Sequence, residues 1–159
     1  MTLSPTILLR LQFLSRVVRK EAAHLAITNQ RLFKTPFTAE IASQLEKNTD
    51  LAEQVDAFVS RFSRLQDTLG DKLLPFLLMA LGEKNSSMID NLDRAERLRL
   101  IPSTDEWLSM RNLRNQMIHE YVEDLAILTN ALQSAHQLVP ILIAASEKIL
   151  SEISNRGWA

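Results

Sequence analysis

Apolar side chains recur at intervals of three and four residues along most of the chain, and this spacing restricts the fold almost entirely to helices. No stretch alternates apolar and polar residues for long enough to predict a strand. Only three glycines and five prolines interrupt the 159 residues, so the helices are expected to be long. The clearest apolar stripe consists of Leu51, Val55, Phe58, Phe62, Leu65, Leu69 and Leu73.

Helix start signals and prolines give the expected bounds of these helices. Residues with capping-box spacing mark starts at Asp50, Ser87 and Ser103. Pro75 and Pro140 lie inside apolar patterns and predict kinks. Short links between long helices predict antiparallel neighbours, hence an up-and-down bundle of about five to six helices in one domain, 1–159. The expected helices are 7–33, 38–45, 50–82, 87–100, 103 to about 121 and 123–153.

The composition excludes several classes of function. Because the chain has no cysteine, it has no disulfide framework, no thiolate metal site and no cysteine nucleophile. Lys and Arg number 18 and Asp and Glu 19, so any contact with RNA must be local or formed by an assembled surface. No apolar run approaches the ~20 residues of a membrane span, and we expect a cytoplasmic protein that does not contact a membrane.

An arginine lies at the centre of an apolar stripe on the helix that is predicted to begin at Ser103. Arg114 has Trp107 and Met110 before it and Ile118 and Tyr121 after it, all at spacings of one or two helical turns. Its guanidinium therefore occupies a position where a core leucine is expected. A charged group in such a place needs either a partner or a function.

His119 does not share the helix face of Arg114. At about 100° per residue, the two directions differ by roughly 140°. His119 lies instead with Arg111, Asn112 and Asn115 on the polar side of the helix. A helix end after His119, or a second copy of the chain, is needed to bring the arginine and the histidine together.

A purely structural interpretation of Arg114 is also open. Asp67 or Asp71 on the long helix 50–82 is placed to pair with a buried arginine there. Arg64, near these aspartates, is then expected to form ordinary ion pairs. The remaining histidines, on separate helices, lack neighbours at metal-ligand spacing, and no phosphate-binding loop or nucleophile elbow is present, so we expect no metal and no cofactor.

Arg114-Asn115, three further residues, His119, one residue and Tyr121 form the pattern Arg-Asn-x3-His-x-Tyr, which resembles the signature of the HEPN superfamily. Within that superfamily the chain is most similar to the HepT-like toxins. Segments 61–69 and 100–107 also resemble the long helix of these proteins and the approach to their motif.

The resemblance covers about 50–153 and leaves 1–48 as an N-terminal helical extension. It implies a homodimeric bundle that is a metal-independent endoribonuclease, the toxin of a type VII toxin-antitoxin system. Arg114 and His119 are the implied catalytic residues, Asn115 orients the histidine or the phosphate, and Asp67 and Arg64 support them.

The resemblance further implies a partner, a small nucleotidyltransferase antitoxin that adenylylates Tyr121. The chemistry suits the residues, because a histidine transfers protons near neutral pH and an arginine fork binds phosphate oxygens. Two copies supply two histidines, one as base and one as acid. Two alternatives stay open: a non-catalytic subunit that binds a nucleotidyltransferase or a nucleotide, and a helical adaptor in which Arg114 is only structural.

Overall fold

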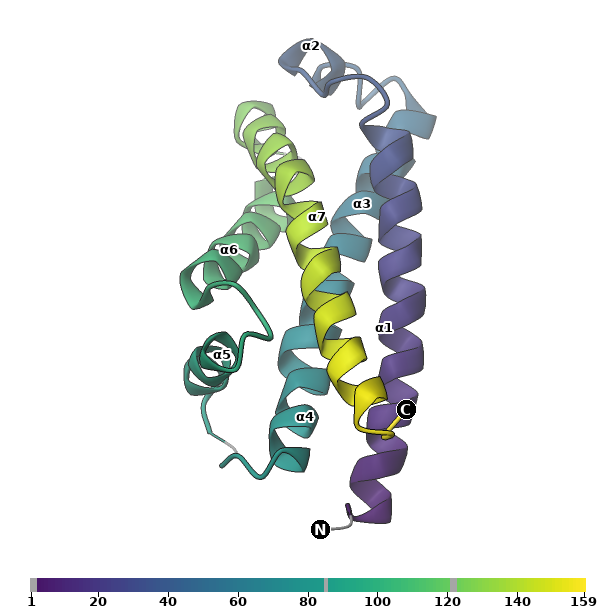
Figure 1. Ribbon diagram of the computed structural model, residues 1–159. Coiled ribbons are helices and arrows are strands. Elements are labelled where there is room, and N and C mark those ends of the chain that lie inside the picture. The colour runs from purple at the N-terminus through teal and green to yellow at the C-terminus, as the bar shows by residue number, and fades with distance from the viewer. Residues whose placement is uncertain (1–2, 85, 121–122) are drawn as a thin grey trace.

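The computed structural model describes residues 3–84, 86–120 and 123–159, and these residues form helices joined by short links, without strands (Figure 1). The predicted all-α bundle with antiparallel packing is confirmed. Within the described ranges, no helix is long and apolar enough to cross a membrane. The elements are α1 Pro5–Leu32, α2 Ala39–Ala42, α3 Thr49–Asp67, the π-helix η1 Thr68–Leu73, α4 Leu74–Ala80, α5 Met88–Arg97, α6 Thr104–Glu120 and α7 Leu125–Asn155.

The long helices share one core. α1 packs on α3, η1, α4 and α7, while α6 packs on α7 and α3. The short helix α5 contacts α4 and α6 at the edge of the bundle (Figure 1). α3 is therefore covered by α1 on one side and by α6 on another, so side chains of α3 can contact both helices.

Side-chain caps explain where most of the helices begin. Ser87 and Ser103 accept backbone N–H bonds of 3.3 and 3.1 Å at the predicted starts of α5 and α6. Asp124 accepts two such bonds at the start of α7. The prediction that Asp50 caps the long helix was wrong, because Asn48 is the cap and accepts the N–H of Leu51 at 3.1 Å.

The predicted core is largely correct, with errors at helix ends. Every member of the α3 stripe from Val55 to Leu73 is fully buried, as expected. The three- and four-residue spacing of apolar side chains also predicts Ile89, Leu98 and Leu125 in the core, but they are between 38% and 52% exposed. The first two flank a short helix at the edge of the bundle, which buries only the apolar residues Leu92 and Ala95 fully. Periodicity does not reveal how narrow a buried face is.

The kink expected at Pro75 takes the form of a π-helical turn just before it. η1 follows α3 and leads into α4 without a loop, and the N–H of Leu74 bonds back five residues to the carbonyl of Leu69. Pro75 has no N–H and its ring clashes with the preceding turn of a regular helix. The wider turn accommodates the proline while the chain continues in helical form.

Gly70, inside η1, lets α6 approach closely. A Cβ atom at this position would lie 3.0 Å from Cζ2 and Nε1 of Trp107, closer than side-chain packing allows. The indole is 2% exposed and is among the largest buried side chains. The glycine in the π turn thus leaves room for the indole of Trp107, while α6 packs mainly on α7 and α3.

We expect Gly70→Ala to lower the free energy of unfolding by about 1–3 kcal/mol, because the new methyl group overpacks the contact with Trp107. Urea unfolding measures this change. In a Trp107→Phe background the same substitution should cost less, since the atoms nearest the new Cβ are absent from phenylalanine. Equal costs in both backgrounds would show that this close contact does not matter.

Candidate functional site

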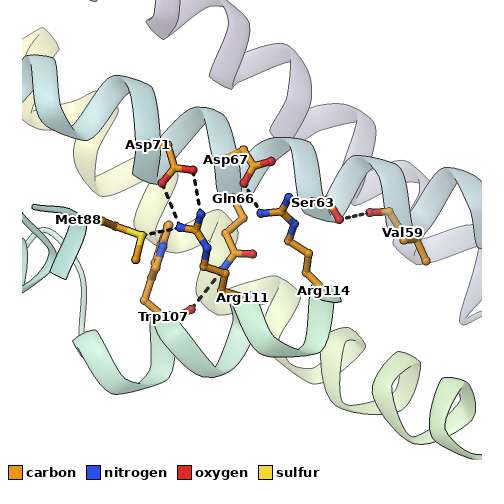
Figure 2. A network of polar contacts seen from close by, with 9 residues as sticks. All are labelled: Val59, Ser63, Gln66, Asp67, Asp71, Met88, Trp107, Arg111 and Arg114. Carbon is orange, nitrogen blue, oxygen red and sulfur yellow. Dashed lines mark hydrogen bonds and ion pairs between the residues drawn. The ribbon is translucent and has the colours of Figure 1, made fainter. Parts of the chain in front are cut away.

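Two ion pairs join α3 and η1 to α6. Arg114 pairs with Asp67, and Arg111 Nη1 lies 3.1 Å from Oδ1 of Asp71 (Figure 2). Asp67 and Asp71 are one helical turn apart, and so nearly are the two arginines, so each pair meets across the two helices. Of the two candidate aspartates, Asp67 is thus the partner of Arg114. Arg111 pairs with Asp71 of η1, so it does not belong to a purely solvated face of α6.

The ion pair of Arg114 lies at the edge of the core. The Arg114 side chain is 20% exposed and that of Asp67 36%. On α6 the buried neighbours of Arg114 are Met110 and Met117, while Ile118 is 47% exposed. The expectation that Ile118 extends the buried stripe was wrong, because the buried face of α6 passes through Met117 instead.

Arg114 has hydrogen-bonding capacity to spare. A guanidinium carries five N–H donors, and the Asp67 pair uses Nη1. The Nε of Arg114 is buried without a hydrogen-bond partner among the described residues. Because this Nε is buried, an additional acceptor would bind the Nη groups of Arg114, whose side chain is 20% exposed.

Buried polar contacts hold α6 in place beside the ion pairs. Gln66 of α3 donates from Nε2 to the carbonyl oxygen of Trp107 at 3.1 Å, and Arg111 donates to the sulfur of Met88 at 2.6 Å (Figure 2). These bonds connect α3, α5 and α6. Arg114 therefore sits on a backbone that is fixed from two sides.

A surface groove of about 530 Å³ opens beside Asp67, between α3 and the C-terminal half of α6. Arg64 stands at this groove and donates to the hydroxyl of Ser60 at 2.8 Å. Its expected ion pair with Asp67 or Asp71 is absent among the described residues, so the prediction for Arg64 was wrong. The groove is lined by Ser60, Ser63, Arg64, Asp67, Met117 and Ile118, among others.

The structure does not bring His119 to this groove within one chain. His119 is exposed in the last turn of α6, as is Asn115 one turn earlier. The structure describes α6 to Glu120 and His119 lies within the helix, so the roughly 140° between its direction and that of Arg114 applies there. The expected helix end after His119 falls next to residues 121–122, which lie outside the described residues, so it stays a prediction. Tyr121 lies outside the described residues.

Glu21 of α1 is a half-buried acid that the sequence analysis did not single out. Its carboxylate accepts the hydroxyl hydrogen of Thr68 at 3.1 Å, and burial raises its pKa, against the smaller lowering effects of this bond and of Arg64 and Lys72. It is the only acidic residue among 5–32, a segment with five basic ones. That isolation was the signal available in the sequence.

The remaining histidines are His24 and His136, and neither lies in a metal-binding cluster of the described residues. His136 stacks on Phe33 with ring centroids 4.1 Å apart and bonds to Asn29, and burial lowers its pKa. Within the ranges that the structure describes, no three His, Asp or Glu side chains are grouped so as to hold a metal ion.

Comparisons with known proteins give no relative. The chain matches no family model, no curated protein and no solved structure. The resemblance of residues 114–121 to a known signature accordingly remains a prediction from the sequence.

We expect a double-mutant cycle on Arg114→Ala and Asp67→Ala to give a coupling energy of about 1–2 kcal/mol in urea unfolding. Both side chains are partly exposed, so the value should fall below the ~3–5 kcal/mol lost when a fully buried pair is broken. The same cycle on Arg111 and Asp71 is the matched control and should give a smaller coupling, since Arg111 is more exposed than Arg114 while the two aspartates are equally exposed. Absence of coupling for Arg114 would contradict the ion pair.

Proposed function

We propose that the protein is a metal-independent endoribonuclease that acts as a homodimer, with Arg114 and His119 from two copies at one site. The observation that carries this proposal is that Arg114, 20% exposed and on a fixed backbone, pairs with Asp67 at the edge of a surface groove. An arginine fork in such a place suits the non-bridging oxygens of a phosphodiester.

The reaction needs two proton transfers. A base removes the proton of the ribose 2′-hydroxyl, whose oxygen attacks the phosphorus, and an acid protonates the departing 5′-oxygen. The products are a 2′,3′-cyclic phosphate and a 5′-hydroxyl. His119 side chains of two copies are the proposed base and acid, and Arg114 stabilises the negative charge that develops on the phosphorane. Asn115, near His119 in sequence, is the proposed orienting amide.

Exposed apolar residues support a dimer at this end of the bundle. Ile118 at the end of α6 and Leu125 and Ile127 at the start of α7 are between 38% and 47% exposed. They flank the chain segment that follows His119. A second copy that covers these residues would place its own His119 near the groove of the first copy, which supplies the convergence that one chain lacks.

The proposed regulator is a nucleotidyltransferase that adenylylates Tyr121. This residue is two positions after His119, so an attached nucleotide brings negative charge and bulk close to the histidine. Modification would then oppose the binding of RNA. RNA and the proposed nucleotidyltransferase are both cytoplasmic, which agrees with the compartment expected for this protein.

A second candidate is a helical adaptor in which Arg114 is only structural. The pairing of Arg114 with Asp67 is the observation that favours it. In this case Arg114→Ala lowers stability and His119→Ala changes nothing. The two candidates therefore differ most clearly at His119.

We expect His119→Ala to abolish RNA cleavage and to change the free energy of unfolding by less than about 0.5 kcal/mol, because the side chain is exposed. Cleavage of a labelled RNA in the presence of a metal chelator measures the activity. His24→Ala is the matched control, since His24 is also an exposed helical histidine, and it should cut at the parental rate.

Cleavage by His119→Ala at the parental rate would refute the ribonuclease proposal. Activity that disappears with the chelator would refute the metal-independent mechanism. A parental protein that cuts no RNA, together with destabilisation by Arg114→Ala, would favour the adaptor.

A further inference from the structure

The positive charge of the chain is concentrated on its first helix. The first 34 residues hold six of the 18 basic residues and one of the 19 acidic ones. The one acid, Glu21, points inward to Thr68. The remainder of the chain carries an excess of acid, so the overall balance near neutrality hides a local basic surface.

Three of these cations share the outer face of α1. Arg16, Lys20 and Arg31 follow one another at spacings that keep them within one side of a helix, and all three are exposed. α3, η1, α4 and α7 cover the other sides of α1. In the part of the chain that the structure describes, no ion pair joins these three cations to a carboxylate. Their charge is therefore available to a partner.

An exposed aromatic ring lies on the same face. Phe13 is 45% exposed, and the guanidinium carbons of Arg10 and Arg16 lie 5.5 and 6.0 Å from its ring centroid. Basic side chains gathered around an exposed ring form a stacking platform of the kind that single-stranded nucleic acids use.

Basic side chains of α3 connect this face with the groove of Arg114. Arg31 and Arg61 line one pocket between α1 and α3, and Arg61 donates to the hydroxyl of Thr28. One turn later, Arg64 lines the groove beside Asp67. The positive charge of Arg64 also lowers the pKa of Glu21 of α1, against the larger raising effect of burial. Asp50 and Glu53 also line the pocket of Arg31, so the basic character fades toward that end of α1.

We propose that Phe13, Arg16, Lys20 and Arg31 form a second RNA-binding surface, the α1 surface, which holds the backbone of a single-stranded segment outside the cleavage groove. From Arg16 to Arg31 this surface extends for about 22 Å along the helix, enough for several nucleotides. Its place in catalysis rests on the proposed ribonuclease function, but its binding of RNA is measurable without cleavage.

The distribution of charge favours RNA over an acidic protein or an anionic membrane. The basic residues recur along the length of α1, whereas its exposed aliphatic residues Leu9 and Ile27 are five helical turns apart. Only Leu9 has an exposed apolar neighbour, Phe13 one turn away, and such a pair is too small for an apolar docking patch. A repeating row of cations matches a polymer with a phosphate in every unit.

The test is fluorescence anisotropy of the full chain with a labelled oligonucleotide of about 20 residues, 2′-O-methylated so that it cannot be cut. The variant is Arg16→Gln, Lys20→Gln and Arg31→Gln combined. Lys47→Gln, Lys84→Gln and Lys148→Gln combined form the control, since these exposed cations lie elsewhere and the loss of charge is identical. Thermal unfolding verifies that both variants are folded.

We expect the α1 variant to bind about tenfold more weakly at ~100 mM salt and the control less than about twofold. The slope of log affinity against log salt should fall by about 2, because each lost phosphate contact in a single strand contributes ~0.7. Phe13→Ala should weaken binding severalfold more than Phe76→Ala through lost stacking.

Equal weakening by the two triple variants would overturn the inference, as would tighter binding of the parent to phosphatidylserine vesicles or to a glutamate-rich helical peptide than to RNA. The result is separable from the ribonuclease proposal. RNA that binds through the α1 surface but is never cut refutes only the enzyme. RNA that is cut, but binds both triple variants alike, refutes only the α1 surface.

Discussion

Two ion pairs join α6 to α3 and η1, and they decide in which directions Arg114 and His119 point. Asp67 and Asp71 face Arg114 and Arg111, and the close approach at Gly70 brings the helices near enough for both pairs to form. These contacts fix the rotation of α6 about its axis. Once Arg114 is turned toward α3, helical geometry turns the exposed His119 away from it. The proposed ribonuclease site therefore needs a second copy to supply the histidine.

The sequence was most informative where burial is complete. The α3 stripe and the serine caps of α5 and α6 were predicted correctly, because fully buried faces and caps leave local patterns. Errors arose where several residues satisfy the same pattern. Asn48 and Asp50 are both good caps, and Ile118 and Met117 both extend an apolar stripe, and only the packing of neighbouring helices selects between them.

The candidate site was predictable in part for the same reason. The aspartates of the neighbouring helix were visible in the sequence, so a pairing of Arg114 with Asp67 or Asp71 was one of its two interpretations, and the structure selects Asp67. The π turn that precedes Pro75 was not foreseen, because its form depends on tertiary contacts. Arg64 was expected to pair with an aspartate but bonds to Ser60, since several donors and acceptors compete on that face.

The most direct test of the shared site is to mix the parental chain with an equal amount of folded His119→Ala chain and to measure RNA cleavage. After random exchange of subunits, mixed dimers hold one histidine instead of two and lack either the base or the acid. We expect the mixture to cut RNA at about half the rate of the same amount of parental protein alone, because about half of the parental chains then lie in mixed dimers. An unchanged rate, with mixed dimers shown to form, would contradict a site shared between two copies.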